Sequence, residues 1–385
     1  MEKNSRIPGF FKLKKENRLR TVKEFANLTK KEIKIIKKGV LTSDIKDKIS
    51  ENVIGTFSLP YSIAPNFLIN KRDYLIPMVT DEPSVVAAAS YGARMTREGG
   101  GIFTKSLGNL MIGQIYITNI KKIQIAKGKI SRAKKEILKL ANKQNPTLIK
   151  LGGGAKDLKI KVFKKTNIGS VLRIHLLIDT KDAMGANTVG IMAEGVAPLI
   201  EKLTGGKALF KIVSNLAEKR LVEVKTVITK KALKKEGFPP DETIDNIVKA
   251  YLIAEFDIYR AVTYNKGILN GMGAVALATG NDWRALEAAS HGFAAKSGKY
   301  KPLAVWRKNK EGNLVGKMII PVTVGIIGGI TQLHPLVKVS LKILKVKSVQ
   351  ELAQIIASVG LVQNLAALRA LVSEGIPAGH KNLKK

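Results

Sequence analysis

Apolar residues recur every three or four positions in the first fifty residues of the chain. This spacing predicts amphipathic helices within residues 16–50. The next stretch, residues 51–70, is interrupted by Pro60 and Pro65, which favours strands and turns. Residues 84–95 are small and apolar on nearly every helical face, so we expect a deeply buried helix there. The positions that define the N-terminal helices are Leu19, Val22, Phe25, Leu28, Ile33, Ile36 and Ile45.

The pattern changes between about Leu107 and Ala217, where short apolar strands alternate with helices. This order of elements suggests a small ferredoxin-like α/β sandwich. We therefore expect an α+β protein in which a small domain, 108–217, is inserted into a large, mainly helical domain formed by 1–107 and 218–379. Strands are predicted at 111–120, 159–163, 171–179 and 208–215, with helices at 131–143 and 186–202.

The composition is that of a folded protein with more than one domain. The chain has 385 residues, of which 45% are hydrophobic, and this is enough for two cores. It has no cysteine, which excludes disulfides, thiolate metal sites and a cysteine nucleophile. Residues 1–20 lack the apolar segment of a signal peptide, and the apolar run 318–330 is too short to span a bilayer. We expect a soluble, cytoplasmic protein that does not associate with membranes.

The formal net charge of +36 is the most unusual bulk property of the chain. It favours polyanionic partners, such as nucleic acids or phosphorylated cofactors. Lysine-rich, solvated helix faces explain the same charge without any partner. Aromatic residues make up only 5% of the chain, and no helix-turn-helix, zinc-finger or RNA-recognition signature occurs. We therefore expect no specific nucleic-acid function.

One lysine and one carboxylate stand in an otherwise small and apolar part of the stretch 259–293. Lys266 and Asp282 are sixteen positions apart, and Asn281 or Asp282 is suited to cap the helix that follows. Charged groups in apolar surroundings tend to pair, because an unpaired buried charge is costly. Spacing alone leaves two interpretations open, a structural ion pair and a catalytic pair. The inner face of the following helix is predicted to carry Trp283, Leu286 and Ala289.

Two predicted helix starts are further candidates for chemistry. Glu82 precedes the predicted helix 84–95, where the helix dipole stabilises a carboxylate. In the segment 178–187, Asp182 is suited to cap the next helix, and Gly185 lets the backbone approach a ligand closely. An ordinary capped helix and an anion-binding site both fit this second segment.

The sequence indicates neither a metal site nor a Rossmann fold. His175, His291, His334 and His380 do not have the spacing of metal ligands. Residues 271–276, GMGAVA, fit the loose dinucleotide fingerprint but lack the acidic residue and the surrounding βαβ unit that would support it. We interpret this run as core packing and expect no metal.

Several longer motifs point to one enzyme family. NKGILNG at 265–271, followed by ATGNDWRA at 278–285, closely resembles the catalytic core of class II 3-hydroxy-3-methylglutaryl-coenzyme A (HMG-CoA) reductases. The resemblance extends from about Ser5 to His380, with the motifs in the order of the family. The other matching motifs are ENVIG at 51–55, PMVTDEPSVVAAAS at 77–90, DAMGAN at 182–187 and EGIPAGH at 374–380.

This resemblance implies the reduction of HMG-CoA to mevalonate and free coenzyme A by two nicotinamide hydrides, a step towards isoprenoids. Lys266 would supply a positive charge and a proton at the thioester oxygen, and Asp282 would orient Lys266. Glu82 would donate or relay protons, and His380 would protonate the departing thiolate. The residues that match substrate-contacting positions are Ser84, Asn215, Arg260 and Asn270.

The resemblance also implies a non-Rossmann nicotinamide site in the small domain, with NADPH or NADH as the cofactor. Asn145 stands where an NADH-preferring relative carries an aspartate that binds the adenosine ribose. Because the family's active site forms between subunits, a homodimer or larger homo-oligomer is expected, with residues 51–55 near the interface. The expected cofactor-binding residues are Asn145, Asp182, Met184, Gly185 and Asn187.

The C-terminal end departs from the family pattern. The family usually continues past this point with a small closing (flap) domain, whereas this sequence ends at Lys385, so 380–385 are predicted to be a stub of the flap. Two functions are therefore open: a working reductase, and a catalytically impaired homologue that binds coenzyme A or nucleotides. Glu82, Lys266 and Asp282 favour catalysis, and the short tail favours the second function.

Overall fold

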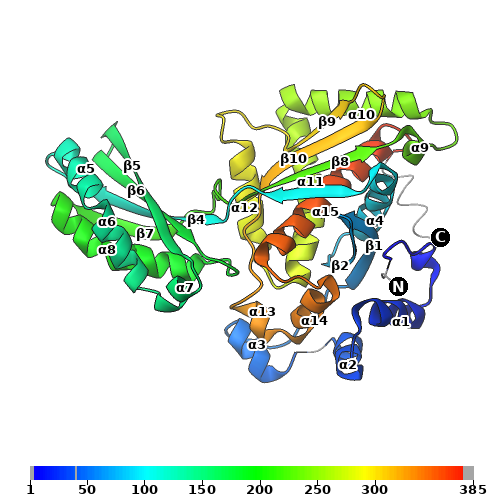
Figure 1. The fold of residues 1–385 in the computed structure, drawn as a ribbon, viewed down its shortest axis with the longest axis horizontal. Helices are drawn as coiled ribbons and strands as arrows, with labels where there is room; N and C mark the ends of the chain where they lie inside the picture. The colour runs from blue at the N-terminus through cyan, green and yellow to red at the C-terminus, as the bar shows by residue number, and fades with distance from the viewer. Residues whose placement is uncertain (1–3, 40, 376–385) are drawn as a thin grey trace. The chain divides into compact units, whose positions relative to one another are not determined.

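The computed structural model describes residues 4–39 and 41–375, and the chain divides into two compact units (Figure 1). The larger unit contains the residues up to Ser106 and those from Val222 onward. The smaller unit is Leu107–Leu221. The chain thus leaves the larger unit once and returns to it once, which makes the smaller unit an insertion.

A six-stranded sheet runs through the larger unit in the order β2-β1-β3-β8-β10-β9. β1 and β2 form an antiparallel pair with an irregularity between Ala64 and Phe67, and β1 pairs with β3 in parallel. Phe67, Ile76 and Met78 on the first two strands are fully buried. The strands are β1 Tyr61–Ile69, β2 Arg72–Val79, β3 Ile102–Ser106, β8 Leu221–Ile228, β9 Ala304–Lys308 and β10 Leu314–Pro321.

Two long helices, α11 and α15, pack against each other and against α4 in the core of this unit. By length and composition α15 could cross a membrane, but 83% of its apolar window is buried inside the protein, as expected of a core helix. The helices of the larger unit are α1 Lys15–Ala26, α2 Lys30–Lys38, α3 Ser43–Ile49, α4 Val85–Thr96, α9 Lys230–Leu233, α10 Pro240–Phe256, α11 Ile258–Ala278, α12 Trp283–Ala294, α13 Ile330–Leu333, α14 Pro335–Leu344 and α15 Val349–Leu371, with short 3-10 turns at Phe10–Lys12 and Arg97–Gly99.

The glycine-rich run 271–276 lies within α11 and is largely buried. A Cβ atom at Gly271 would lie 3.0 Å from Val359 Cγ1 and 3.1 Å from Gln363 Oε1, both on α15. Gly271 therefore lets the two helices approach closely. This contact supports the interpretation of the run as core packing rather than a dinucleotide loop.

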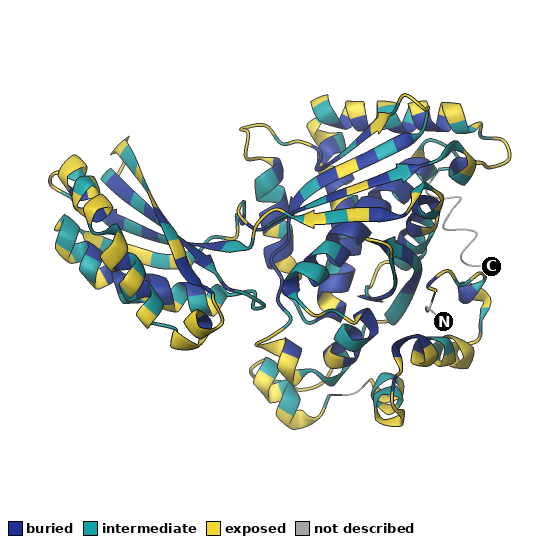
Figure 2. Ribbon diagram, viewed as in Figure 1, coloured by how far each residue is buried: buried dark blue, intermediate teal, exposed yellow. Residues whose placement is uncertain are grey.

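The smaller unit is a four-stranded sheet with helices on one face (Figure 2). The strand order is β5-β6-β4-β7, and every neighbouring pair is antiparallel. With helices before β5 and before β7, this is the ferredoxin-like arrangement. The prediction of an α+β protein with a ferredoxin-like insertion is confirmed. The elements are β4 Leu110–Thr118, α5 Ile123–Arg132, α6 Lys134–Lys143, α7 Pro146–Lys150, β5 Gly154–Thr166, β6 Gly169–Asp179, α8 Ala186–Thr204 and β7 Lys207–Val213.

The first helical connection of this unit differs from the prediction. A helix was expected at 131–143, and α6 occupies most of that range, but a further helix, α5, precedes it and ends at Arg132. Ala133 has φ −80° and ψ 7°, which interrupts the helical backbone between the two. Ile130, Ile137 and Ala141 are buried at helix-like spacings across this interruption, so a periodicity argument cannot detect it.

Candidate active site

Glu82 forms a small polar cluster with Lys266 and Asn270. Its Oε2 atom accepts hydrogen bonds from Lys266 Nζ at 2.8 Å and from Asn270 Nδ2 at 3.2 Å. Lys266 and Asn270 are four residues apart on α11, so both side chains lie on one face of that helix. The cluster joins a cation, a carboxyl group and an amide from segments that are 184 residues apart in the sequence.

The packing of α11 against β2 places Glu82 beside this helix. Glu82 lies in the turn that follows β2, where its N–H donates a hydrogen bond to Thr80 Oγ1 at 3.1 Å. The start of α11 is fixed by Asp257, whose carboxylate accepts a hydrogen bond from the N–H of Tyr259 at 3.0 Å. A local hydrogen bond therefore holds Glu82 at the end of β2, and Lys266 lies within the regular part of α11.

The cluster lies at the surface of the larger unit. The side chains of Lys266 and Glu82 are 58% and 45% exposed. The prediction of apolar surroundings for Lys266 is wrong, because the neighbouring Ile268 and Leu269 face the core on another side of α11. Exposed ion pairs add little to folding stability. Stability therefore does not account for the cluster, whereas its exposure leaves it open to a substrate.

Asp282 does not pair with Lys266, contrary to the expectation from their spacing. It caps α12 instead: Oδ1 accepts hydrogen bonds from the N–H groups of Arg284 at 3.0 Å and Ala285 at 3.2 Å. Burial raises the pKa of this carboxyl group, but the hydrogen bonds from these two residues outweigh burial and hold the pKa below its ordinary value. The free N–H groups of the helix start thus take the place that Lys266 was expected to fill. Trp283, predicted on the inner face of α12, is 37% exposed.

Ser84 occupies a strained position close to Glu82. Its backbone has φ 73° and ψ −15°, in the left-handed region that residues other than glycine seldom adopt. Its hydroxyl oxygen is buried and has no hydrogen-bond partner in the part of the chain that the structure describes. Backbone strain and an unsatisfied polar atom are both features of functional sites. Ser84 is therefore ready to donate a hydrogen bond to a ligand beside Glu82.

A second candidate site lies in the smaller unit, in the tight loop between β6 and α8. Gly185 is the N-cap of α8, with φ 97°, and it makes no side-chain cap hydrogen bond. The predicted cap by Asp182 is wrong, because Asp182 lies three residues before the N-cap position. A Cβ atom at Gly185 would lie 2.3 Å from Thr180 Cγ2, so this turn requires glycine. The start of a 19-residue helix without a side-chain cap offers free N–H groups, which suit a phosphate.

Arg220 holds this loop in place, and no sequence pattern had indicated it. The residue is only 3% exposed. Its Nη1 atom donates hydrogen bonds to Thr180 Oγ1 at 3.2 Å, to the carbonyl of Ala183 at 3.2 Å and to that of Met184 at 3.0 Å. Burial lowers the pKa of the guanidinium group to about 10, although nearby carboxylates counteract burial, so the group keeps its charge at neutral pH. A single arginine in a loop gives no periodicity or spacing from which this contact could be predicted.

Comparison with known proteins places the chain in a family. A sequence profile described as hydroxymethylglutaryl-coenzyme A reductase matches residues 14–385. The chain belongs to this reductase family. It is 51% identical over 380 residues to the 3-hydroxy-3-methylglutaryl-coenzyme A reductase of Archaeoglobus fulgidus, an alignment that covers 99% of this chain and 86% of the relative.

Two further members of the reductase family extend the comparison. A probable reductase of Borreliella burgdorferi is 38% identical over 341 residues, which cover 86% of this chain and 75% of the relative. A solved structure of the class II reductase of Streptococcus pneumoniae, bound to NADPH in open conformations, has a TM-score of 0.92 at 41% identity. That match covers 95% of this chain and 99% of the other.

The residues that were expected to contact the substrate occur in both units. Asn270 belongs to the cluster described above, and Arg260 is half-buried in the first turn of α11. Ser84 precedes α4. Asn215 is exposed in the loop after β7, in the smaller unit. The expected catalytic His380 lies outside the described residues.

The residues that were expected to bind the cofactor lie in the loop before α8 and at α7. Met184 is half-buried, and Asn187 is exposed in the first turn of α8. Asn145 caps α7, where its Oδ1 accepts a hydrogen bond from the N–H of Leu148 at 3.0 Å. The preceding residue, Gln144, packs against Gly195 in α8. The two segments that carry the expected cofactor residues therefore pack near each other.

The histidines that the structure describes have structural partners. His175 Nε2 lies 3.0 Å from Gln114 Nε2, and His291 Nδ1 lies 2.6 Å from the hydroxyl of Tyr300. His334 caps α14. Among the described residues, no group of three or more His, Cys, Asp or Glu side chains is arranged to hold a metal ion.

Proposed function

We propose that this chain reduces HMG-CoA to mevalonate and free coenzyme A, with oxidation of two molecules of NADPH or NADH. The observation that carries this proposal is the hydrogen-bonded cluster of Glu82, Lys266 and Asn270 in a chain of the reductase family. The reaction takes up two hydrides and two protons for each thioester consumed. It therefore needs groups that stabilise negative charge on oxygen and groups that deliver protons.

The cluster suits both needs. When a hydride adds to the thioester carbonyl, negative charge develops on its oxygen, and the Lys266 ammonium group supplies a positive charge to stabilise it. The alkoxide formed in the second reduction needs a proton, and the Glu82 carboxyl group relays one through its 2.8 Å hydrogen bond to Lys266. Asn270 orients that carboxyl group through its own hydrogen bond to Oε2. Asp282 is the third expected catalytic residue. It lies at the start of α12, where the hydrogen bonds that cap this helix keep its carboxyl group ionised.

Other side chains bind the substrate and complete the proton transfers. The Arg260 guanidinium group suits the carboxylate of the hydroxymethylglutaryl group. The unsatisfied Ser84 hydroxyl donates a hydrogen bond to the same group, which relieves the cost of its burial. Coenzyme A leaves as a thiolate, and His380 is the residue that we assign to its protonation.

We assign the nicotinamide cofactor, which supplies the hydrides, to residues 182–187. The free N–H groups at the start of α8 suit its pyrophosphate, and Gly185 leaves room for the phosphate oxygens to approach the backbone. The relative from Streptococcus pneumoniae with the same fold was solved with NADPH bound. Arg220 does not reach the ligand in this proposal; it positions the loop through the carbonyl groups of Ala183 and Met184.

Arg220→Met should raise KM for NADPH about ten- to hundredfold, because charge-assisted hydrogen bonds that hold the loop are lost. The value of kcat should change much less, since the reacting groups lie elsewhere. Steady-state kinetics at varied NADPH would measure this, with Arg220→Lys as the control that keeps the charge. If thermal unfolding shifts strongly while KM stays constant, Arg220 serves folding of the unit and not the cofactor site.

Asn145→Asp should shift the cofactor preference towards NADH. An aspartate also caps helices well, so α7 should be preserved. An ionised carboxylate at this point repels the 2′-phosphate of NADPH and accepts hydrogen bonds from the ribose hydroxyl of NADH. We expect the unmodified protein to use NADPH at least as well as NADH. The ratio of kcat/KM for the two cofactors would measure the shift, and strict NADH use by the unmodified protein would refute the idea.

We propose a homodimer, or a larger homo-oligomer, in which the active site forms between subunits. Ile54, in the segment 51–55, is fully exposed, and Phe57 is 90% exposed. Phe256 and Tyr259, at the junction of α10 and α11, are 80% and 85% exposed. Large apolar side chains exposed in groups are typical of an interaction surface. Because α11 also carries Lys266, Tyr259 lies on the helix that bears the cluster.

Ile54→Asp should dissociate the dimer and abolish most of the activity, because a charge would be buried in the interface. Light scattering at micromolar concentration would measure the mass, and the reductase assay the activity. Phe11→Asp is a suitable control, since Phe11 is also exposed, at 72%, but lies far from this segment in the sequence. A fully active monomer of the unmodified protein would contradict the proposal.

The overall reaction can be tested in one cuvette. NADPH oxidation is followed by absorbance after addition of HMG-CoA, and free thiol is titrated at the end. We expect two molecules of NADPH oxidised for each thiol released. Tight binding of coenzyme A without oxidation would favour the alternative of a catalytically impaired binding protein. We assign the enzyme to the cytoplasm, in keeping with its cysteine-free sequence.

A further inference from the structure

The sheet of the smaller unit has one face that its helices do not cover. Helices α5, α6 and α8 pack together against the opposite face. Residues paired directly across strands share a face of the sheet. On the open face, Lys161 pairs with Arg173, Arg173 with Tyr116, and Tyr116 with Phe210. One row across all four strands therefore presents two cations beside two aromatic rings.

A third ring completes this surface. Phe163 lies two residues beyond Lys161 on β5, and thus on the same face. Lys161 Nζ lies 5.1 Å and Arg173 Cζ 5.4 Å from the centre of the Phe163 ring. The rings of Tyr116 and Phe210 have centroids 4.8 Å apart and are tilted by 35°. The chain is only 5% aromatic, but three of its rings lie together on this face.

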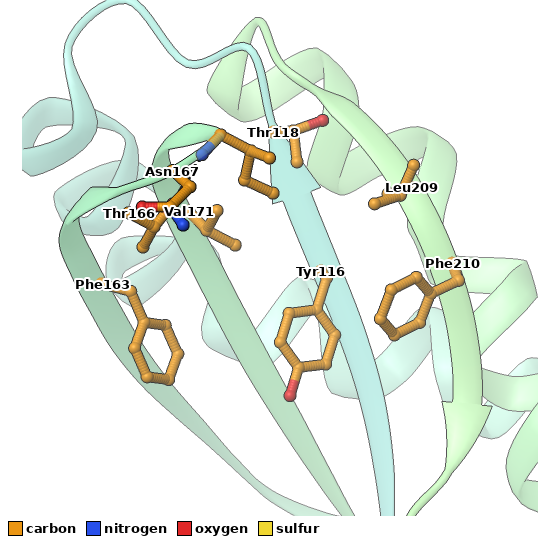
Figure 3. A pocket seen from close by; sticks show the side chains of 9 residues that line it. Tyr116, Thr118, Phe163, Thr166, Asn167, Val171, Leu209 and Phe210 are labelled. Carbon is orange, nitrogen blue, oxygen red and sulfur yellow. Dashed lines mark hydrogen bonds between the residues drawn. The ribbon is translucent and has the colours of Figure 1, made fainter.

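These rings line an open cavity of about 570 Å³ (Figure 3). In the figure, Tyr116 and Phe210 project from neighbouring strands on the same side of the sheet as Phe163. Leu209 at the rim is 60% exposed and Ile168 is 67% exposed. Among the described residues that line the cavity, none carries a carboxylate. An exposed apolar surface of this kind, bordered by cations, indicates a ligand that combines planar rings with negative charge.

We propose that this face binds single-stranded nucleic acid without strict sequence preference. Bases stack on exposed aromatic rings, and any base can do so. Lys161 and Arg173 lie next to the rings, where they contact the phosphates of the bound nucleic acid. A four-stranded sheet that stacks bases on its open face is an established mode of RNA recognition. The net charge of +36 draws a polyanion towards the chain.

Two other occupants fit less well. A second copy docked through the same face would bring Lys161 and Arg173 against the same two cations of the other copy. The nicotinamide cofactor is assigned to residues 182–187, which follow the C-terminal end of β6. The cavity instead includes Asn167 and Ile168, just before the N-terminal end of that strand. Since β6 has 11 residues, the two places are roughly 30 Å apart.

Fluorescence anisotropy with a labelled oligouridylate of about twelve nucleotides would test the proposal on the full-length protein. Tyr116→Leu and Phe210→Leu should each weaken binding about tenfold, because a base loses its stacking partner. Lys161→Gln combined with Arg173→Gln should also reduce the salt dependence, by about 1.4 in the slope of log K against log salt, since each phosphate contact contributes about 0.7. Thermal unfolding and reductase activity should stay unchanged in all these variants, which shows that the fold is intact.

Lys135→Gln combined with Lys139→Gln is the matched control. Both lysines are exposed on α6, which covers the other face of the sheet, and the pair removes the same charge. Its effect should be much smaller. An equal loss in the control, or equal binding of a duplex of the same length, would overturn the proposal in favour of diffuse electrostatic attraction. Displacement of the oligouridylate by NADPH would assign the face to the cofactor, and a change of oligomeric state in Phe210→Leu without loss of affinity would assign it to a second copy.

Discussion

Lys266→Met should reduce kcat about 100- to 1000-fold, the range seen when one group that stabilises an oxyanion is removed. The Lys266 side chain is 58% exposed and its ion pair with Glu82 contributes little to stability, so the variant should fold normally. KM for HMG-CoA should change much less than kcat, because the charge is needed mainly when negative charge develops on the carbonyl oxygen. Steady-state kinetics, with circular dichroism to monitor folding, would measure both.

Lys249→Met is a matched control for this prediction. Lys249 is an exposed lysine on α10 that donates a 3.4 Å hydrogen bond to Asn246 Oδ1. The same loss of charge and length there should leave kcat unchanged. If Lys266→Met unfolded the protein, or if both variants had similar rates, the charge of Lys266 would not be catalytic.

Glu82→Gln should lower kcat about 100- to 10,000-fold, as expected when a general acid or base is lost. The amide oxygen of glutamine can still accept the hydrogen bonds from Lys266 and Asn270, so the geometry of the cluster is kept. What is lost is the ability to carry a proton. Steady-state kinetics with HMG-CoA and NADPH would measure this loss.

Asp81→Asn provides the control for Glu82. Asp81 is the exposed carboxylate next to Glu82, and both residues lie in the turn after β2. Its replacement should leave kcat unchanged. A large loss of kcat in Asp81→Asn, with normal turnover in Glu82→Gln, would mean that Asp81 and not Glu82 is the catalytic carboxylate.

Part of this site could be predicted from the sequence because it depends on local chemistry. Glu82 and Lys266 stand in motifs long enough to identify their family. The predicted helix at 186–202 corresponds to α8, whose buried residues include Val189 and Met192. Gly185 is required because its turn needs a positive φ, which glycine adopts without strain. Each of these features is determined within about ten residues of the chain.

The partner of Lys266 could not be predicted in the same way. Asp282 is close in sequence, but its carboxylate is used by the N–H groups of its own helix, a local competition that the spacing argument ignored. Glu82 reaches Lys266 only because β2 and α11 pack together across 184 residues. The role of Arg220 likewise depends on tertiary packing, since its acceptors lie about 36 to 40 positions away.

The most direct test of the account is a double-mutant cycle on kcat with Lys266→Met, Glu82→Gln and the double variant, in the assay that follows NADPH oxidation with HMG-CoA. If the two groups act as one unit through their 2.8 Å hydrogen bond, the double variant should be about as slow as the slower single variant. If the two losses simply multiply, Lys266 and Glu82 act independently, and the central claim that they form one catalytic pair is contradicted.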